Sequence, residues 1–151
     1  MKKLITIITV FVLLLSCSKD EKEDPAILEV TLSYYDIVLK DYKPDIYADA
    51  YLFPESIGKN VDLSKCMMVT AKLGLLDDSN EKLIGAYSYK GEADATGKLI
   101  IKDIAPGKYL LLVSSNGRMT YSTKMITLPA GQTVYETKKF SKEYLDSGEP
   151  W

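Results

Sequence analysis

One stretch decides the fold of this protein: ATGKLIIKDIAPGKY, which runs from Ala95 to Tyr109. Leu99 and Ile101 are two residues apart, which is the spacing that places side chains on the same face of a strand. Pro106 fixes φ near −65°, and Gly107 tolerates a positive φ. The pair therefore predicts a type II turn. A second strand is expected to follow from Lys108. The stretch therefore predicts two strands joined by a tight turn.

The rest of the chain repeats this pattern of short strands and turn signals. Leu28, Val30 and Leu32 alternate with polar residues, which predicts a strand with one buried face. Asn116-Gly117 favours positive φ at both positions and predicts a type I′ hairpin turn. The predicted strands cover residues 28–34, 47–52, 66–76, 83–90, 98–102, 108–115, 119–128 and 133–140. Seven or eight short strands predict an all-β fold, an antiparallel Ig-like β-sandwich.

The decisive stretch also resembles a known signature. A glycine, a strand of alternating apolar residues, a Pro-Gly turn and a tyrosine that opens the next strand are typical of transthyretin-like (prealbumin-like) domains, including the carboxypeptidase regulatory-like and CnaB modules. The resemblance implies that these modules' inward positions correspond to Leu99, Ile101 and Ile104 on one strand, and to Tyr109, Leu111 and Val113 on the facing strand. It also implies an accessory, adhesive or spacer role, although a fold does not determine a function.

Two features of the predicted strand at residues 109–114 refine this expectation. The run lacks the carboxylate that CnaB domains use for an internal isopeptide bond, so no such crosslink is expected. Leu110 and Leu112 are apolar but face away from the assigned core. This predicts either a central strand or a covered outer face.

The N-terminus predicts export. Lys2 and Lys3 precede an apolar run from Leu4 to Leu15. That run is shorter than the ~20 residues that a membrane-spanning helix needs, which indicates a signal peptide at residues 1–16 rather than an uncleaved anchor. The boundary Leu14-Leu15-Ser16-Cys17 resembles a bacterial lipobox. We therefore expect cleavage between Ser16 and Cys17, and lipidation of the Cys17 thiol.

The alternative for Cys17 is a disulfide with Cys66, the second cysteine of the chain. Cys66 lies in the run Cys66-Met67-Met68-Val69, which reads as a buried strand. Free cysteine often behaves there as a small hydrophobic residue. Lipidation of Cys17 is therefore favoured over the disulfide.

The residues after the cysteine predict a tether and a destination. Six of the nine residues at 17–25 are charged, and the stretch cannot bury apolar surface, so a disordered acidic tether is expected. Ser18, Lys19, Asp20 and Glu21 resemble the signal that exports some Gram-negative lipoproteins to the outer face of the outer membrane. Cell-surface exposure is predicted, with the periplasmic face as the alternative. The sandwich is expected over residues 26–140, followed by a C-terminal tail at residues 141–151.

The composition narrows the function classes. The sequence contains no histidine, which excludes a Ser-His-Asp triad and an imidazole metal site. Its formal charge of −2 becomes −4 when Lys2 and Lys3 are removed, which argues against nucleic acid as a partner. The acidic run at residues 77–81 lacks the spacing of a calcium loop and is expected to be a turn. No catalytic residue, metal or cofactor is predicted; a small carboxylate-dependent hydrolase is the minor alternative.

One group of aromatic residues is a candidate binding face. Tyr47, Tyr51 and Phe53 alternate with Ala48, Ala50 and Leu52, so they are predicted to share one face of a strand. Such a face suits stacking on a sugar or gripping a protein partner. The alternative is that these rings pack beneath a neighbouring loop or against other parts of the sandwich. The sequence thus predicts a non-catalytic binding, adhesion or accessory module with a protein or glycan partner, or alternatively a periplasm-facing assembly factor.

Overall fold

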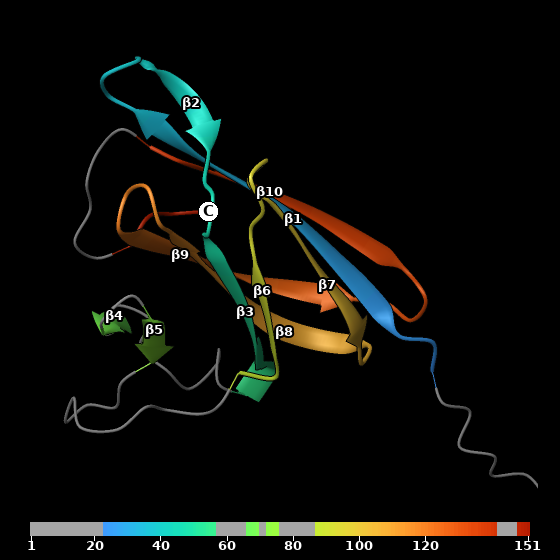
Figure 1. Ribbon diagram of the computed structural model, residues 1–151. Coiled ribbons are helices and arrows are strands. Elements are labelled where there is room, and N and C mark those ends of the chain that lie inside the picture. Colours follow the sequence, from blue (N-terminus) through green and yellow to red (C-terminus); the bar gives the residue numbers. More distant parts are fainter. Residues whose placement is uncertain (1–22, 57–65, 70–71, 76–86, 142–147) are drawn as a thin grey trace, which may run out of the picture.

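The structure, a computed structural model, describes residues 23–56, 66–69, 72–75, 87–141 and 148–151. Ten strands are described, and eight of them form two facing four-stranded sheets (Figure 1). The β-sandwich predicted from the sequence is therefore confirmed. The strands are β1 (Ala26–Asp36), β2 (Asp41–Pro44), β3 (Asp49–Pro54), β4 (Cys66–Val69), β5 (Lys72–Leu75), β6 (Tyr89–Glu92), β7 (Lys98–Ile104), β8 (Gly107–Ser115), β9 (Thr120–Leu128) and β10 (Thr133–Phe140).

The first sheet is organised around β1. Strand β10 runs along one edge of β1, while β7 and β2 share the other edge, β7 over the first half and β2 over the last four residues. The β1–β10 pair is parallel, which corrects the expectation of purely antiparallel pairing. The second sheet has the order β6-β3-β8-β9 and is antiparallel throughout. In each sheet an edge strand from the last third of the chain, β10 or β9, has one described strand neighbour.

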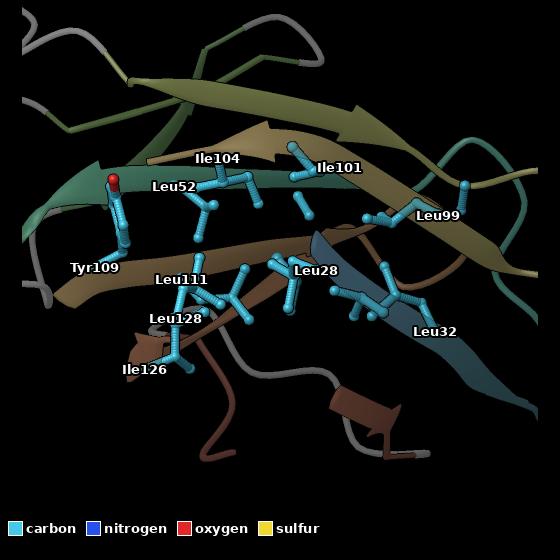
Figure 2. Close-up of a cluster of buried hydrophobic side chains, with 14 of the residues drawn as sticks. Leu28, Leu32, Leu52, Leu99, Ile101, Ile104, Tyr109, Leu111, Ile126 and Leu128 are labelled. Atoms are coloured by element: carbon cyan, nitrogen blue, oxygen red, sulfur yellow. The ribbon is translucent and has the colours of Figure 1, made fainter. Parts of the chain in front are cut away.

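The core lies between the sheets and follows the predicted alternation. Leu28, Val30 and Leu32 of β1 are fully buried, and the alternate residues of β7 and β8 that the family resemblance placed inward are at most 9% exposed. Figure 2 shows ten of the core side chains, Leu28, Leu32, Leu99 and Ile101 among them, meeting between the two sheets. Their burial removes apolar surface from water, at roughly 25 cal/mol per Å², and is the main source of stability. The buried inward set on β7 and β8 is Leu99, Ile101, Ile104, Tyr109, Leu111 and Val113.

Strand β8 is buried on both faces, which resolves the question of its second apolar face. It lies between β3 and β9, and Leu110 and Leu112 are each 1% exposed. The central-strand prediction and the covered-face prediction are therefore both correct.

Gly97 fixes the start of the decisive stretch. Its φ is 76°, in the left-handed region that favours glycine, and a Cβ there would lie 2.3 Å from the carbonyl oxygen of Leu32. The Asp94 carboxylate stabilises the turn before Gly97, because it accepts hydrogen bonds from the Thr96 N–H (2.7 Å) and from the Thr96 hydroxyl (2.6 Å). These bonds, first of all that from the Thr96 side chain, lower the pKa of Asp94. The close backbone approach explains why β7 must be entered through a glycine.

The Pro-Gly turn differs from the prediction. Gly107 has a φ of 158°, far from the value near +80° of a type II turn, and it is already the first residue of β8. Two tyrosines shape the connection instead. The Tyr109 hydroxyl donates to the Ala105 carbonyl (2.8 Å), and the Ala105 N–H donates to the Tyr89 hydroxyl (2.9 Å). The type II assignment was wrong because side chains, rather than a backbone turn bond, close this corner.

The Asn-Gly hairpin also differs. Ser115 pairs with Thr120, so the β8–β9 loop contains four residues, 116–119, and the left-handed residue is Met119 with a φ of 51°. The type I′ prediction was therefore wrong. Gly117 is needed for space instead, because a Cβ would lie 2.5 Å from the ring of Tyr34.

Two further strand predictions need correction. The run at residues 66–76, expected to be one long strand, forms two strands, β4 and β5, which pair with each other. Strand β2 was not predicted at all. Of the predicted strand at 83–90, only the end falls among the described residues, as the start of β6.

Candidate binding surfaces

Most of the large apolar side chains that are exposed lie at one end of the sandwich. This distal end is defined by the β1–β2 loop, the corner between β2 and β3, and the β8–β9 loop. Figure 1 shows the β1–β2 hairpin at the opposite end of β1 from the start of the described chain. Seven of the large apolar residues with exposed side chains belong to this end: Ile37, Val38, Leu39, Tyr42, Ile46, Tyr47 and Met119.

The β1–β2 loop presents three consecutive aliphatic residues on an ordered turn. Ile37, Val38 and Leu39 are 63%, 82% and 59% exposed. The turn is held by Asp36, whose Oδ1 accepts hydrogen bonds from the N–H groups of Val38 (2.9 Å) and Leu39 (3.1 Å). Lys40 closes the turn with a left-handed φ of 56°. The backbone is thus fixed while the side chains remain free for contact.

Charges and rings brace the base of this hairpin. Lys43 Nζ lies 3.0 Å from Asp36 Oδ2, and this bond, followed by the Leu39 N–H, lowers the pKa of Asp36. The same contact raises the pKa of Lys43. Tyr35 and Tyr42 pack edge to face with ring centroids 5.3 Å apart. These contacts hold β1 and β2 together next to the exposed residues Ile37, Val38 and Leu39.

The corner between β2 and β3 connects the other distal loops. Asp45 is fully buried and accepts hydrogen bonds from the Ser115 hydroxyl and from the Gly117 N–H (2.9 Å). Burial raises the pKa of this carboxyl, and the bond from Ser115 partly opposes that shift. Next to it, the Asn116 side chain donates to the Ile46 carbonyl (3.3 Å). Asp45 therefore ties the β8–β9 loop to the sandwich.

The predicted aromatic face is only partly assembled. Tyr51 and Phe53 lie on the same face of β3, but they are 3% and 2% exposed. Tyr47 lies before β3, where a positive φ of 61° breaks the alternation, so it is 67% exposed at the distal end. The prediction of a shared face for all three was wrong, because the strand begins only at Asp49.

What Tyr51 and Phe53 form is a packed aromatic cluster. The half-exposed ring of Tyr87 meets both edge to face, with centroids 5.2 and 6.5 Å away. The Tyr51 hydroxyl donates to Asp49 Oδ2 (2.9 Å), and Lys90 forms an ion pair with Asp49 Oδ1 (2.9 Å). Burial, followed by the hydrogen bond to Asp49, raises the pKa of Tyr51 to about 12. Of these three described rings, Tyr87 alone is substantially exposed, at 47%.

A pocket of about 610 Å³ lies near the start of β1, at the end opposite the distal loops. Its lining residues are Glu23, Asp24, Pro25, Tyr89, Asp103, Ala105 and Pro106. The three carboxylates are exposed to solvent, unlike the buried pair that the hydrolase alternative would require. Among the described residues no group of three or more potential metal ligands is close enough to hold an ion. The described lining of this pocket thus lacks the buried carboxylates that the hydrolase alternative calls for.

The residues of the predicted lipid anchor lie outside the described part of the chain. These are Ser16, Cys17, Ser18, Lys19, Asp20 and Glu21; the acidic run at residues 77–81 also lies outside it. No helix among the described residues is long and apolar enough to cross a bilayer. The anchor and export signal therefore remain predictions.

The distal hairpin itself was missed in the sequence. Ile37-Val38-Leu39 reads as part of a strand, and only Asp36 signals otherwise. An aspartate can accept hydrogen bonds from the N–H groups two and three residues later and so start a turn. The sequence YYDIVLKDY, with acids at residues 36 and 41 flanking an aliphatic run, carries that signal.

Comparisons with known proteins identify the fold. No protein-family model and no curated protein match this sequence. A proposed carbohydrate-binding protein from Pseudomonas aeruginosa matches in structure with a TM-score of 0.51 and 16% identity, covering 78% of this chain and 91% of that protein. The minor pilin GBS52 of Streptococcus agalactiae matches with a TM-score of 0.45 and 14% identity, over 80% of this chain and 46% of the pilin. The full-length major pilin SpaD of Corynebacterium diphtheriae matches with a TM-score of 0.44 and 12% identity, over 80% of this chain and 33% of the pilin.

This chain therefore spans less than half the length of either pilin. At 16% identity, the match to the Pseudomonas protein shows a shared fold. The comparison thus agrees with the sheet arrangement and leaves function to be argued from the chain's own residues. The chain carries the β-sandwich fold that it shares with this bacterial protein.

Proposed function

We propose that this protein is a lipid-anchored, non-catalytic binding module that is displayed at the outer membrane and uses its distal end to contact a partner. The observation that carries the proposal is the position of the apolar loops relative to the start of β1. The tether that leads to Cys17 precedes β1, whereas Ile37, Val38 and Leu39 follow its far end. At ~3.3 Å per residue, the strand separates the two by roughly 35 Å.

The exposure of these side chains supports contact with a partner. Soluble monomers seldom expose several neighbouring aliphatic residues on one protrusion, and such patches mark interaction sites. Loops that are held by a rigid scaffold are also the common location of binding residues. Branched aliphatic side chains contain no hydrogen-bonding groups for sugar hydroxyls, so the partner is proposed to be a protein. The shared fold of the Pseudomonas protein, a proposed carbohydrate binder, makes a glycan the second candidate.

The anchor is proposed to be a diacylglyceryl group on the sulfur of Cys17 together with an acyl chain on its amino group. A single acyl chain binds membranes only marginally, at ~0.8 kcal/mol per buried CH₂, so two or more are needed for stable attachment. The test is Cys17→Ala expressed with its own signal. Wild type should label with palmitate and partition into detergent, and the variant should do neither. A variant that stays membrane-bound would contradict the anchor.

The orientation can be tested separately with single cysteines on intact cells. In a Cys66→Ser background, Val38→Cys reports on the distal end and Ala130→Cys on the β9–β10 turn beside Asp24, where the Gly131 N–H donates to the Asp24 carbonyl. A bulky membrane-impermeant maleimide should react with residue 38 faster than with residue 130. Equal or reversed rates would contradict distal presentation. Labelling of both only after lysis would favour the periplasm-facing alternative.

The binding role is tested by crosslinking. A photoreactive amino acid at position 38 should crosslink a specific protein on intact cells, and one at position 130 should not. The triple variant Ile37→Ser, Val38→Ser, Leu39→Ser should abolish that partner's binding while the export signal and fold are unchanged. Crosslinking to saccharide alone would instead favour the glycan. Retained partner binding by the triple variant would contradict the role of the loop.

A further inference from the structure

The last four residues of the chain, Gly148–Trp151, lie against the edges of both sheets. The Glu149 N–H donates to the Tyr121 carbonyl on β9 (2.7 Å). The Glu149 carboxylate accepts hydrogen bonds from the Ser141 N–H with both oxygens (2.8 and 2.9 Å), at the end of β10. Figure 1 shows the C-terminus beside β9. The C-terminal segment thus bridges the open side between the edge strands β9 and β10.

The C-terminal segment pairs with Lys138, a buried lysine of β10. Lys138 is 5% exposed although it is charged, and its Nζ lies 5.3 Å from the ring centroid of Phe140 in the core. That Nζ donates to Glu149 Oε1 (3.2 Å) and to the Pro150 carbonyl. A buried ammonium group is costly unless it is paired and hydrogen-bonded. Both groups that stabilise it come from the C-terminal segment.

The aromatic end of the segment fills the remaining space. Trp151 is partly buried against the core cluster, and Lys124 Nζ lies 5.2 Å from the centroid of its ring. Lys124 is itself held by Glu136, 2.7 Å away. At the other end Gly148 has a φ of 82°, and a Cβ there would lie 2.8 Å from the ring of Tyr121. Each residue of the segment therefore contacts specific residues of the surface between β9 and β10. We call this surface the groove.

We propose that the groove between β9 and β10 is a peptide-binding site for a Gly-Glu-Pro-Trp segment, which the chain fills with its own residues 148–151 and which the segment of a second copy fills by exchange. The site recognises an acidic side chain, the carbonyl of the proline that follows it, and the aromatic ring after the proline. Pro150 restricts the segment's backbone, which reduces the entropy lost on binding.

The arrangement of the contacts permits exchange between copies. The polar contacts of the segment run through Glu149 and Pro150, and residues 142–147 connect them to Ser141. An identical segment from another copy would make the same contacts, so the two arrangements differ mainly in the connecting residues, as in domain swapping. The second copy then competes with a local segment of high effective concentration. This inference does not depend on the lipid anchor or on the distal loops.

The first experiment separates the segment from the folded protein. A protease site is introduced within residues 142–147 of the mature chain carrying Cys17→Ala, and the folded protein is cut. Because Trp151 is the sole tryptophan, its fluorescence reports on occupancy of the groove. The cut segment should stay bound, and a synthetic peptide of residues 145–151 with Trp151→Phe should replace it, so that the Trp151 emission changes to that of the released segment. A peptide with Glu149→Gln should bind at least about tenfold more weakly, the effect expected for loss of a charged hydrogen bond.

The groove side is tested with matched lysine variants. Lys138→Met should weaken peptide binding at least about tenfold, whereas Lys139→Met, which changes an exposed neighbour on β10, should leave it unchanged. A sandwich that unfolds when it is cut would show that the segment is an integral part of the core and would overturn the proposal. A cut segment that no peptide replaces would overturn it as well.

Exchange between copies is tested by mixing two complementary full-length variants. One carries Lys138→Met and keeps the segment, and the other carries Trp151→Ala and keeps the groove. Each should be monomeric alone, and the mixture should form heterodimers by light scattering with a blue-shifted Trp151 emission. A mixture that remains monomeric would overturn exchange, even if the synthetic peptide binds.

Discussion

The two hairpin loops at the distal end share their length and the left-handed conformation of their last residue, but they have different surroundings. Each contains four residues, 37–40 in the β1–β2 loop and 116–119 in the β8–β9 loop, and each ends in a left-handed residue, Lys40 (φ 56°) or Met119 (φ 51°). The residue before each loop caps it. Asp36 accepts from the loop's N–H groups, and the Ser115 hydroxyl accepts from the Arg118 N–H (3.0 Å). Length and turn geometry therefore do not distinguish the loops.

What distinguishes them is the contact that each makes with the rest of the sandwich. The β8–β9 loop is tied to the buried Asp45, and its Gly117 packs against the ring of Tyr34. The β1–β2 loop instead directs Val38 into solvent, with 82% of that residue exposed. One loop thus contributes to stability and the other is available for binding, although the turn type is shared.

The largest expected effect tests the β8–β9 loop, which is anchored to the sandwich by Asp45. Asp45→Ala removes an acceptor from the Ser115 hydroxyl and the Gly117 N–H in a fully buried site. We expect a loss of about 2 to 3 kcal/mol in the free energy of unfolding, because hydrogen bonds to a charged group contribute about 1.5 to 3 kcal/mol each and removal of a buried charge offsets part of this. Urea denaturation measures the loss.

Asp36→Ala is the matched control, because it removes the cap of the exposed loop. Its carboxylate is solvent-accessible and its partners can turn to water, so a clearly smaller loss is expected. Equal losses for the two variants would show that the loops do not differ in anchoring.

The second prediction compares one residue from each loop. In Gly117→Ala, the new methyl group would lie about 2.5 Å from the Tyr34 ring, so the ring or the loop must move. We expect a loss of about 1 to 3 kcal/mol, typical of overpacking. Val38→Ala should change stability by less than about 0.5 kcal/mol, as for other exposed positions.

A double variant shows whether the loss has the proposed cause. If the clash with the ring is responsible, Gly117→Ala should cost little in a Tyr34→Ala background. An unchanged cost in that background would place the strain in the loop backbone instead.

Much of the architecture could be predicted because it rests on local patterns. The alternation of Leu28, Val30 and Leu32, and of Leu99 and Ile101, specifies which face of each strand is buried, and the structure confirms it. A period of two is a property of the strand itself, so it is visible in a single sequence. The same reasoning located β8, β9 and β10 to within one or two residues.

The candidate sites depend on contacts between distant residues and were largely hidden. Asn116-Gly117 has the composition of a type I′ turn, but the glycine serves to admit Tyr34, which is 83 positions earlier in the sequence. The lysine at position 138 reads as a solvent-exposed residue of an edge strand, and only the fold brings Glu149 to it. Tyr47 was misplaced because a single left-handed residue shifts the start of β3.

The third prediction uses pH to examine Asp45, the buried carboxyl group that ties the β8–β9 loop to the sandwich. Burial raises the pKa of Asp45 above that of an unfolded aspartate, for which the reference value is 3.8. The folded state therefore binds the proton more tightly, and Asp45 contributes less stability as the pH rises through its folded pKa. Wild type should gain stability relative to Asp45→Asn on acidification from pH 7 towards 4.

The comparison with Asp45→Asn isolates this group, because Asp36 and Asp94, whose pKa values are lowered, are present in both proteins and lose stability at lower pH in both. Chemical denaturation at several pH values measures the difference. A stability difference between the two proteins that is independent of pH would show that Asp45 ionises equally in the folded and unfolded states.

The smallest expected effect tests the left-handed residue that ends each of the two loops. Lys40 and Met119 adopt a left-handed conformation that costs a residue with a Cβ roughly 1 to 2 kcal/mol, while glycine pays about 0.5 to 1 kcal/mol in additional chain entropy. Lys40→Gly and Met119→Gly should therefore each raise the free energy of unfolding by about 0.5 kcal/mol. Similar gains at both sites would show that the turn backbones are energetically equivalent and that anchoring alone separates the loops. A gain only at Met119 would mean that the anchored loop is forced into its conformation by Asp45, whereas the exposed loop adopts its turn without strain.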